Sequence, residues 1–130
     1  MNNKNSIYLV LAFTLLFFGC EKLEIGKAYD CSIGKKYNLN WDLSFTIDSI
    51  NDYRCPIDVV CVWAGDVKLF INIDRPNNSL DTAMYLNNPD RNPVQIGDYS
   101  LKVLEVNPLP KSNVITDPKD ILVKMIILKN

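Results

Sequence analysis

Apolar and polar residues alternate with a period of two along most of the chain from Ala28 onward. The clearest alternation covers residues 43–50 and 61–73, and a weaker one covers residues 80–86. A period of two places successive side chains on opposite faces of an extended strand, whereas an amphipathic helix repeats about every 3.6 residues. No segment has the apolar spacing of a helix of three turns. The pattern therefore predicts an all-β chain.

Two irregularities in the alternation predict details of the sheets. Leu101 and Val103 are followed by Leu104 and Val106, and this change of phase by one residue predicts a β-bulge. Residues 121–127 are apolar on nearly both faces, which is typical of a strand in the interior of a sheet.

Clusters of turn-forming residues separate the predicted strands. They lie at residues 32–36, 75–79, 87–93, 97–98 and 107–119. Seven or eight short strands in one domain, residues 28–130, predict a two-sheet β-sandwich that is immunoglobulin-like or similar. A small β-barrel is the alternative.

The charge balance and the lack of histidine exclude several functions. The chain carries 14 Lys and Arg residues against 15 Asp and Glu residues, so it lacks the basic surface of a nucleic-acid-binding protein. It has no histidine, which removes histidine zinc sites and the triads that use an imidazole base. Asp48, Asp52, Asp58 and Asp66 flank one loop, but aspartates in a strand-rich chain are mostly turn formers. We therefore expect no enzyme, no cofactor and no metal site.

The first twenty residues have the organisation of a secretory signal. Lys4 precedes an apolar run over residues 7–18, shorter than the about 20 residues of a membrane-spanning helix. A buried hydrophobic helix or strand is the alternative interpretation. Phe17-Phe18-Gly19-Cys20 resembles the lipobox of bacterial lipoproteins, and the polar start that follows is similar to lipoproteins of the Bacteroidetes group.

The lipobox resemblance implies a division of the chain and a location. Residues 1–19 are then a signal peptide, and residues 20–27 are a lipidated N-terminus and polar tether. Cys20 carries a diacylglycerol and acyl chains such as palmitate, which anchor the protein in a membrane. The resemblance places the protein in the bacterial cell envelope, lipid-anchored at the outer membrane.

The three other cysteines predict one disulfide. An exported chain enters an oxidising compartment, and any pairing of Cys31, Cys55 and Cys61 leaves one thiol free. We favour a Cys55–Cys61 bridge, because it closes a short loop that begins with Pro56. Cys31 is then a buried free thiol. A bridge from Cys31 to Cys55 or to Cys61 is the alternative.

The cysteine loop also carries a motif. Arg54-Cys55-Pro56, followed by Cys61-Val62-Trp63-Ala64-Gly65, resembles the pattern R-C-P-x4-C-x-W-A-G of a family of uncharacterised bacterial lipoproteins and small exported domains. The resemblance implies a strand on each side of the motif and an exported location, and it implies no activity.

Several residues of this loop are candidates for recognition. Trp63 lies an even number of residues from Cys61 and Val67, so in a continuous strand it would share their face. This position predicts an indole that covers the disulfide inside the core. An exposed Trp63 that binds a partner is the alternative. Arg54 either pairs with Asp52 or Asp58 or points outward, and Gly65 allows a bulge or a close approach. The candidate recognition residues are Arg54, Pro56, Ile57, Asp58 and Trp63.

These observations predict a non-catalytic binding or scaffolding module, monomeric and held at the membrane by its N-terminal lipid. Its partner would be an unidentified envelope protein or glycan. The alternative function is a protease inhibitor, or a ligand- or glycan-binding module, that acts through the Cys55–Cys61 loop, since a rigid loop lowers the entropic cost of binding.

Overall fold

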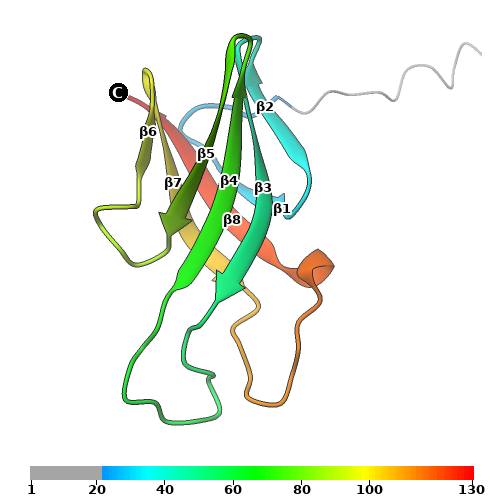
Figure 1. Cartoon of the computed structure of the whole chain (residues 1–130), viewed down its shortest axis with the longest axis vertical. Coiled ribbons are helices and arrows are strands. Elements are labelled where there is room, and N and C mark those ends of the chain that lie inside the picture. Colours follow the sequence, from blue (N-terminus) through cyan, green and yellow to red (C-terminus); the bar gives the residue numbers. More distant parts are fainter. Residues whose placement is uncertain (1–21) are drawn as a thin grey trace, which may run out of the picture.

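Two antiparallel sheets pack face to face in the computed structural model of the protein, which describes residues 22–130 (Figure 1). The predicted signal peptide and Cys20 lie outside the described residues. Within residues 22–130 the chain forms eight strands and a short 3-10 turn at Pro118–Asp120. The strands are β1 (Ala28–Ser32), β2 (Lys36–Asn40), β3 (Leu43–Asp52), β4 (Val67–Arg75), β5 (Asn78–Tyr85), β6 (Val94–Ile96), β7 (Tyr99–Asn107) and β8 (Leu122–Lys129).

Each sheet has four strands, and the predicted β-sandwich is confirmed. One sheet has the order β1-β8-β7-β6, and the other has the order β2-β3-β4-β5. All neighbouring strands are antiparallel. The apolar strand β8 lies between β1 and β7, as its two-sided hydrophobicity predicts.

The core lies between the inner faces of the two sheets. In β4, Val67, Leu69, Ile71 and Ile73 are buried, and the residues between them face outward. The rings of Tyr37 and Phe45 stack within this core, with centroids 5.4 Å apart. Each Val, Leu or Ile side chain that is fully buried stabilises the fold by about 1.5–3 kcal/mol.

The bulge predicted from the phase slip in residues 101–106 is confirmed. The register between β7 and β8 shifts between Val103 and Glu105. As a result Val103 and Val106 are both buried, while Leu104 is exposed. A second register shift lies in β3, between Ile47 and Ser49.

Residues 22–27 do not form the free tether that the sequence predicts. Leu23 is buried in the core, and its backbone N–H donates to the Asn38 carbonyl at 3.3 Å. The Gly26 N–H donates to the Ile127 carbonyl at 2.7 Å. Leu23 stands between charged residues, so the composition of this segment predicts a polar tether and gives no sign that Leu23 is buried. From Lys22 onward this segment is part of the folded domain.

Two long connections project from the same end of the sandwich, at the bottom of Figure 1. One joins β3 to β4 over residues 53–66, and the other joins β7 to β8 over residues 108–121. The described chain begins in the upper part of the molecule, away from these connections (Figure 1). In residues 22–130 no helix combines the length and the apolar character needed to cross a bilayer.

Candidate functional site

The β3–β4 connection is closed by the predicted disulfide. Cys55 and Cys61 are bonded, with their Cα atoms 5.9 Å apart. On the chain-entropy model a bridge around so short a loop stabilises the fold by about 2–3 kcal/mol. The bridge also fixes the path of the five residues between the two cysteines.

Cys31 is the free, buried thiol that this pairing predicts. Burial raises the pKa of its thiol to about 12, and the neighbouring Asp30 carboxylate adds to the shift. The reactive thiolate is therefore scarce at neutral pH. Cys31 is a core residue and not a site.

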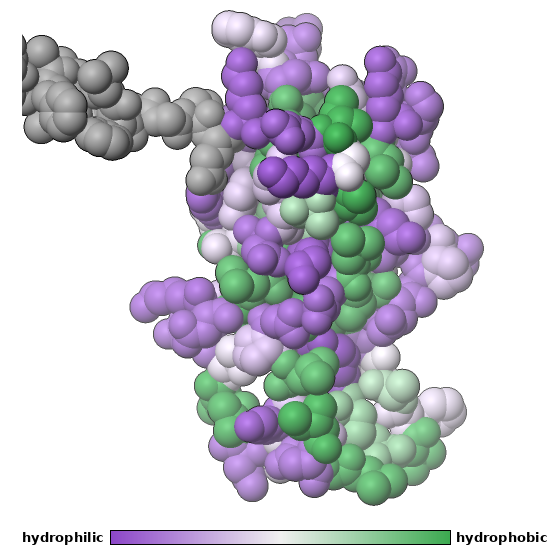
Figure 2. Space-filling view, turned by 180° about the vertical axis from the view of Figure 1, so that it is seen from behind, coloured by the Kyte–Doolittle hydropathy of each residue, from purple (hydrophilic) through white to green (hydrophobic). Residues whose placement is uncertain are grey.

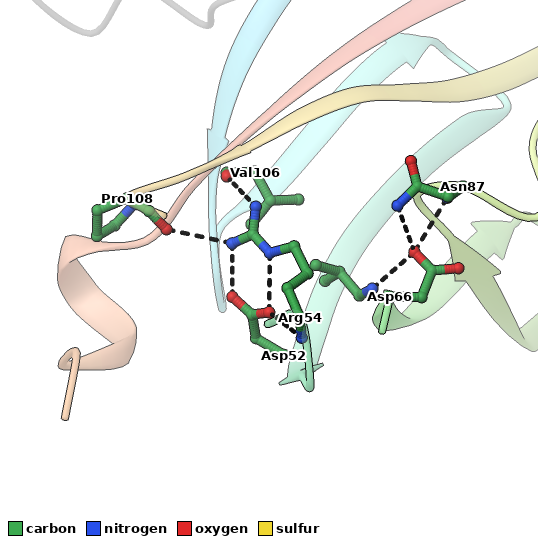
Figure 3. A network of polar contacts seen from close by, with 7 residues as sticks. Asp52, Arg54, Asp66, Asn87, Val106 and Pro108 are labelled. Atoms are coloured by element: carbon green, nitrogen blue, oxygen red, sulfur yellow. Dashed lines mark hydrogen bonds and ion pairs between the residues drawn. The ribbon is translucent and has the colours of Figure 1, made fainter. Parts of the chain in front are cut away.

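Arg54 fastens the loop to the opposite sheet. Its guanidinium binds the Asp52 carboxylate through two bonds, Nε–Oδ1 at 2.8 Å and Nη2–Oδ2 at 2.5 Å (Figure 3). It also donates to the carbonyl oxygens of Val106 at 2.9 Å and Pro108 at 3.2 Å. The Arg54 side chain is only 11% exposed. Of the two predicted roles, the structure therefore assigns Arg54 the structural one: it points inward, and its donors are engaged.

Gly65 allows the two ends of the loop to approach closely, as predicted. Its φ is +69°, and a Cβ atom at this position would lie 1.9 Å from the Tyr53 carbonyl oxygen. The pairing continues beyond the strands, because the Cys55 N–H donates to the Ala64 carbonyl at 2.9 Å. No other residue type fits this position without a backbone shift.

The tip of the same loop is tied to the β7–β8 connection. The Ile57 N–H donates to the Pro110 carbonyl at 3.0 Å. The Asp58 carboxylate accepts from the Ser112 N–H at 2.9 Å and from the Ser112 hydroxyl at 2.7 Å. These hydrogen bonds lower the pKa of the Asp58 carboxyl. The two connections therefore form one structural unit.

The four aspartates considered for a carboxylate pair have separate surroundings. Asp52 is bound to Arg54, and Asp58 is bound to Ser112. Asp66 accepts from the Val67 N–H and from both nitrogens of Asn87 (Figure 3). Asp48 is exposed on β3. Three of the four carboxylates thus have structural partners of their own.

Trp63 is exposed, and the prediction that it covers the disulfide inside the core is wrong. The residue is 83% exposed, and Val60 and Val62 beside it are also exposed. The parity argument failed because β4 begins only at Val67. Residues 61–66 belong to the loop, and the left-handed Gly65 breaks the alternation between Trp63 and the strand.

An exposed apolar surface results, which we call the apolar tip. Figure 2 shows apolar side chains gathered at this lower end of the molecule. The sequence pointed to Ile57 and Trp63 but missed the contribution of the second connection. A signal was present, since strongly apolar residues lie inside two turn-rich segments with no strand to bury them. The apolar tip consists of Ile57, Val59, Val60, Val62, Trp63, Leu109, Val114 and Ile115.

Of the predicted recognition residues, the structure brings Ile57 and Trp63 to this surface. Pro56 lies at the start of the disulfide loop, where its carbonyl accepts from the Val59 N–H at 3.3 Å. Arg54 and Asp58 hold the loop in place, as described above.

Neither a group of metal-ligating side chains nor a similarity to known proteins identifies a further functional site. In the part of the chain that the structure describes, no three Cys, Asp or Glu residues are grouped so that they could hold a metal ion. Comparison with protein-family models, with curated proteins and with solved structures gives no match to this chain.

Proposed function

We propose that the protein is a lipid-anchored, exported binding module without catalytic activity, and that its apolar tip inserts into a groove of a partner protein of the cell envelope. The observation that carries this proposal is the exposure of Trp63 and its aliphatic neighbours on a fixed loop. Contiguous exposed apolar patches mark interaction sites in soluble proteins. A tryptophan at the centre of such a patch is typical of an interface hot spot.

The construction of the apolar tip supports recognition by shape. The Cys55–Cys61 bridge, the Arg54 contacts and the Asp58–Ser112 bonds hold both connections in one conformation. A surface that is already ordered loses less conformational entropy on binding. Such order favours a partner with a complementary groove.

The charges of the two connections support a protein partner more than an anionic lipid surface. Residues 53–66 and 108–121 contain three basic and four acidic side chains. One of the basic side chains, Arg54, is already bound to Asp52. Proteins that bind anionic membranes through a surface usually surround their apolar residues with Lys and Arg.

Protease inhibition is a special case of the same binding mode. A disulfide-closed loop that is supported from one side can enter a protease cleft in one conformation. Assays against cysteine and serine proteases, with wild type and Trp63→Ser compared, distinguish an inhibitor from a binder of other envelope proteins.

The binding proposal is tested by photo-crosslinking in intact cells. We expect the full chain with a photoreactive residue at Val60 to give a discrete protein adduct, because this side chain is fully exposed in the loop that carries Trp63. The same residue placed at Leu80, which is exposed on β5, is the matched control and should give none. Trp63→Ser should remove the adduct at position 60. Equal adducts at both positions, or adducts to lipid alone, would contradict the proposal.

The proposed anchor has its own measurement. Mass analysis of the protein from membranes is expected to show a chain that begins at an acylated Cys20, and Cys20→Ser should leave the chain unprocessed. An unmodified chain that retains Met1 would rule out the lipoprotein assignment. The folded domain and its apolar tip do not depend on that result.

A further inference from the structure

A second exposed tryptophan lies at the opposite end of the sandwich. Trp41 occupies the turn between β2 and β3 and is 94% exposed. This turn and the turn between β4 and β5 both lie at the upper end in Figure 1, whereas the apolar tip is at the lower end. The proposed function uses neither turn.

Trp41 borders an open hollow of about 480 Å³ on the outer face of the sheet. The size is within the range of about 300–1,000 Å³ that small-ligand sites occupy. Lys22 approaches one side of the indole, with its Nζ 5.4 Å from the ring centroid. The high exposure of Trp41 leaves most of the indole surface open to a ligand.

The floor of the hollow is polar. Asn38, Ser44 and Asp74 form a row across β2, β3 and β4, because Asn38 pairs with Ser44 and Ser44 pairs with Asp74 in the strand registers. Lys36 also lines the hollow and forms an ion pair with Asp74 at 2.6 Å. The row therefore offers amide, hydroxyl, carboxylate and ammonium groups side by side.

The charges of this hollow balance. Its lining contains two basic side chains, Lys36 and Arg75, and two acidic ones, Asp42 and Asp74. Such a lining does not select a phosphate or another strong anion, which would require an excess of basic groups. It offers both donors and acceptors, which a hydroxyl group can use at once.

We propose that this hollow, which we call the Trp41 groove, binds a neutral oligosaccharide. A pyranose ring has an apolar face of C–H groups and a rim of hydroxyl groups. The flat indole of Trp41 matches the apolar face, and the Asn38–Ser44–Asp74 row matches the rim. The open hollow leaves the rest of a longer sugar chain in solvent.

Binding is measured with the full chain and neutral gluco-, manno-, xylo- and N-acetylglucosamine oligosaccharides as probes. The chain contains two tryptophans, so Trp63→Phe makes Trp41 the only source of indole fluorescence. We expect at least one probe to change this fluorescence in a saturable way. Calorimetry should give the same affinity for wild type and Trp63→Phe.

The decisive variant is Trp41→Ala, for which we expect affinity to fall by about tenfold or more. Its melting temperature should stay near that of wild type, because the replaced side chain is exposed. Trp63→Ala is the matched control and should bind the probe normally. No binding by any neutral probe, equal binding by Trp41→Ala, or a preference for oligogalacturonate would overturn the proposal. None of these results depends on whether the apolar tip binds a protein.

Discussion

Replacing Gly65 by alanine is expected to destabilise the fold by about 3 kcal/mol or more. Two costs add at this position. The φ of +69° is unfavourable for any residue with a Cβ atom, and that atom would lie 1.9 Å from the Tyr53 carbonyl oxygen. The obstacle is backbone, so it can move only if the base of the loop opens. Urea unfolding followed by circular dichroism measures the loss.

Gly34 provides the matched control for this variant. Its φ is +78°, but nothing lies within 4 Å of the position of an added Cβ. Gly34→Ala should therefore destabilise the fold only through the unfavourable positive φ, by about 1 kcal/mol. The difference between the two variants measures the close approach at the base of the loop. Equal losses would show that the contact between Gly65 and Tyr53 is unimportant.

Replacing Arg54 by methionine is expected to lower the free energy of unfolding by about 3 kcal/mol. The variant keeps much of the apolar length of the side chain but removes the guanidinium donor from two carbonyl oxygens and from the Asp52 carboxylate, which retains the Arg54 backbone N–H at 3.2 Å. Arg54→Lys should recover only part of the loss, because an ammonium group cannot reproduce the planar two-bond geometry. The free energy of unfolding and the proteolytic susceptibility of residues 53–66 are the measurements.

An exposed ion pair serves as the control for Arg54. Lys124 lies 3.3 Å from Glu105, and their side chains are 41% and 51% exposed. Lys124→Met should change stability by about 0.5 kcal/mol or less, since water screens such pairs. If Arg54→Met were no more harmful than Lys124→Met, the proposed cross-sheet fastening would be wrong.

The strands could be predicted from the sequence because their pattern is local. One buried face per strand imposes a period of two, and the bulge near Val103 shows as a change of phase. The Cys55–Cys61 bridge followed from the short spacing of the two cysteines. These features depend on neighbours along the chain.

The recognition surface could be predicted only in part, because it depends on contacts between distant segments. Arg54 and the carbonyl of Val106 are 52 residues apart in sequence, and Asp58 and Ser112 are 54 apart. No periodicity reports such contacts. The burial predicted for Trp63 was wrong for a related reason. The alternation of faces assumes a continuous strand, but the left-handed backbone at Gly65 turns the chain between Trp63 and β4.

Trp41 was missed although a signal was present. A tryptophan between Asn40 and Asp42 is an unusual apolar residue in a tight polar turn. The Asp42 N–H donates to the Asn40 side-chain oxygen at 2.9 Å, which explains why the two polar residues flank it. The hollow beside the indole is completed by Asp74 and Arg75 at the end of β4, which no local pattern connects with residue 41.

The ties at the lower end have a mechanical consequence. They join the β3–β4 connection of one sheet to strand β7 of the other, through Arg54 to Val106, and to the β7–β8 connection, through Asp58 to Ser112. We therefore expect a tensile load applied to Trp63 to be shared by the two sheets. Under the proposed anchoring at Cys20 and the proposed binding at the apolar tip, a pull between the two sites would pass through both sheets.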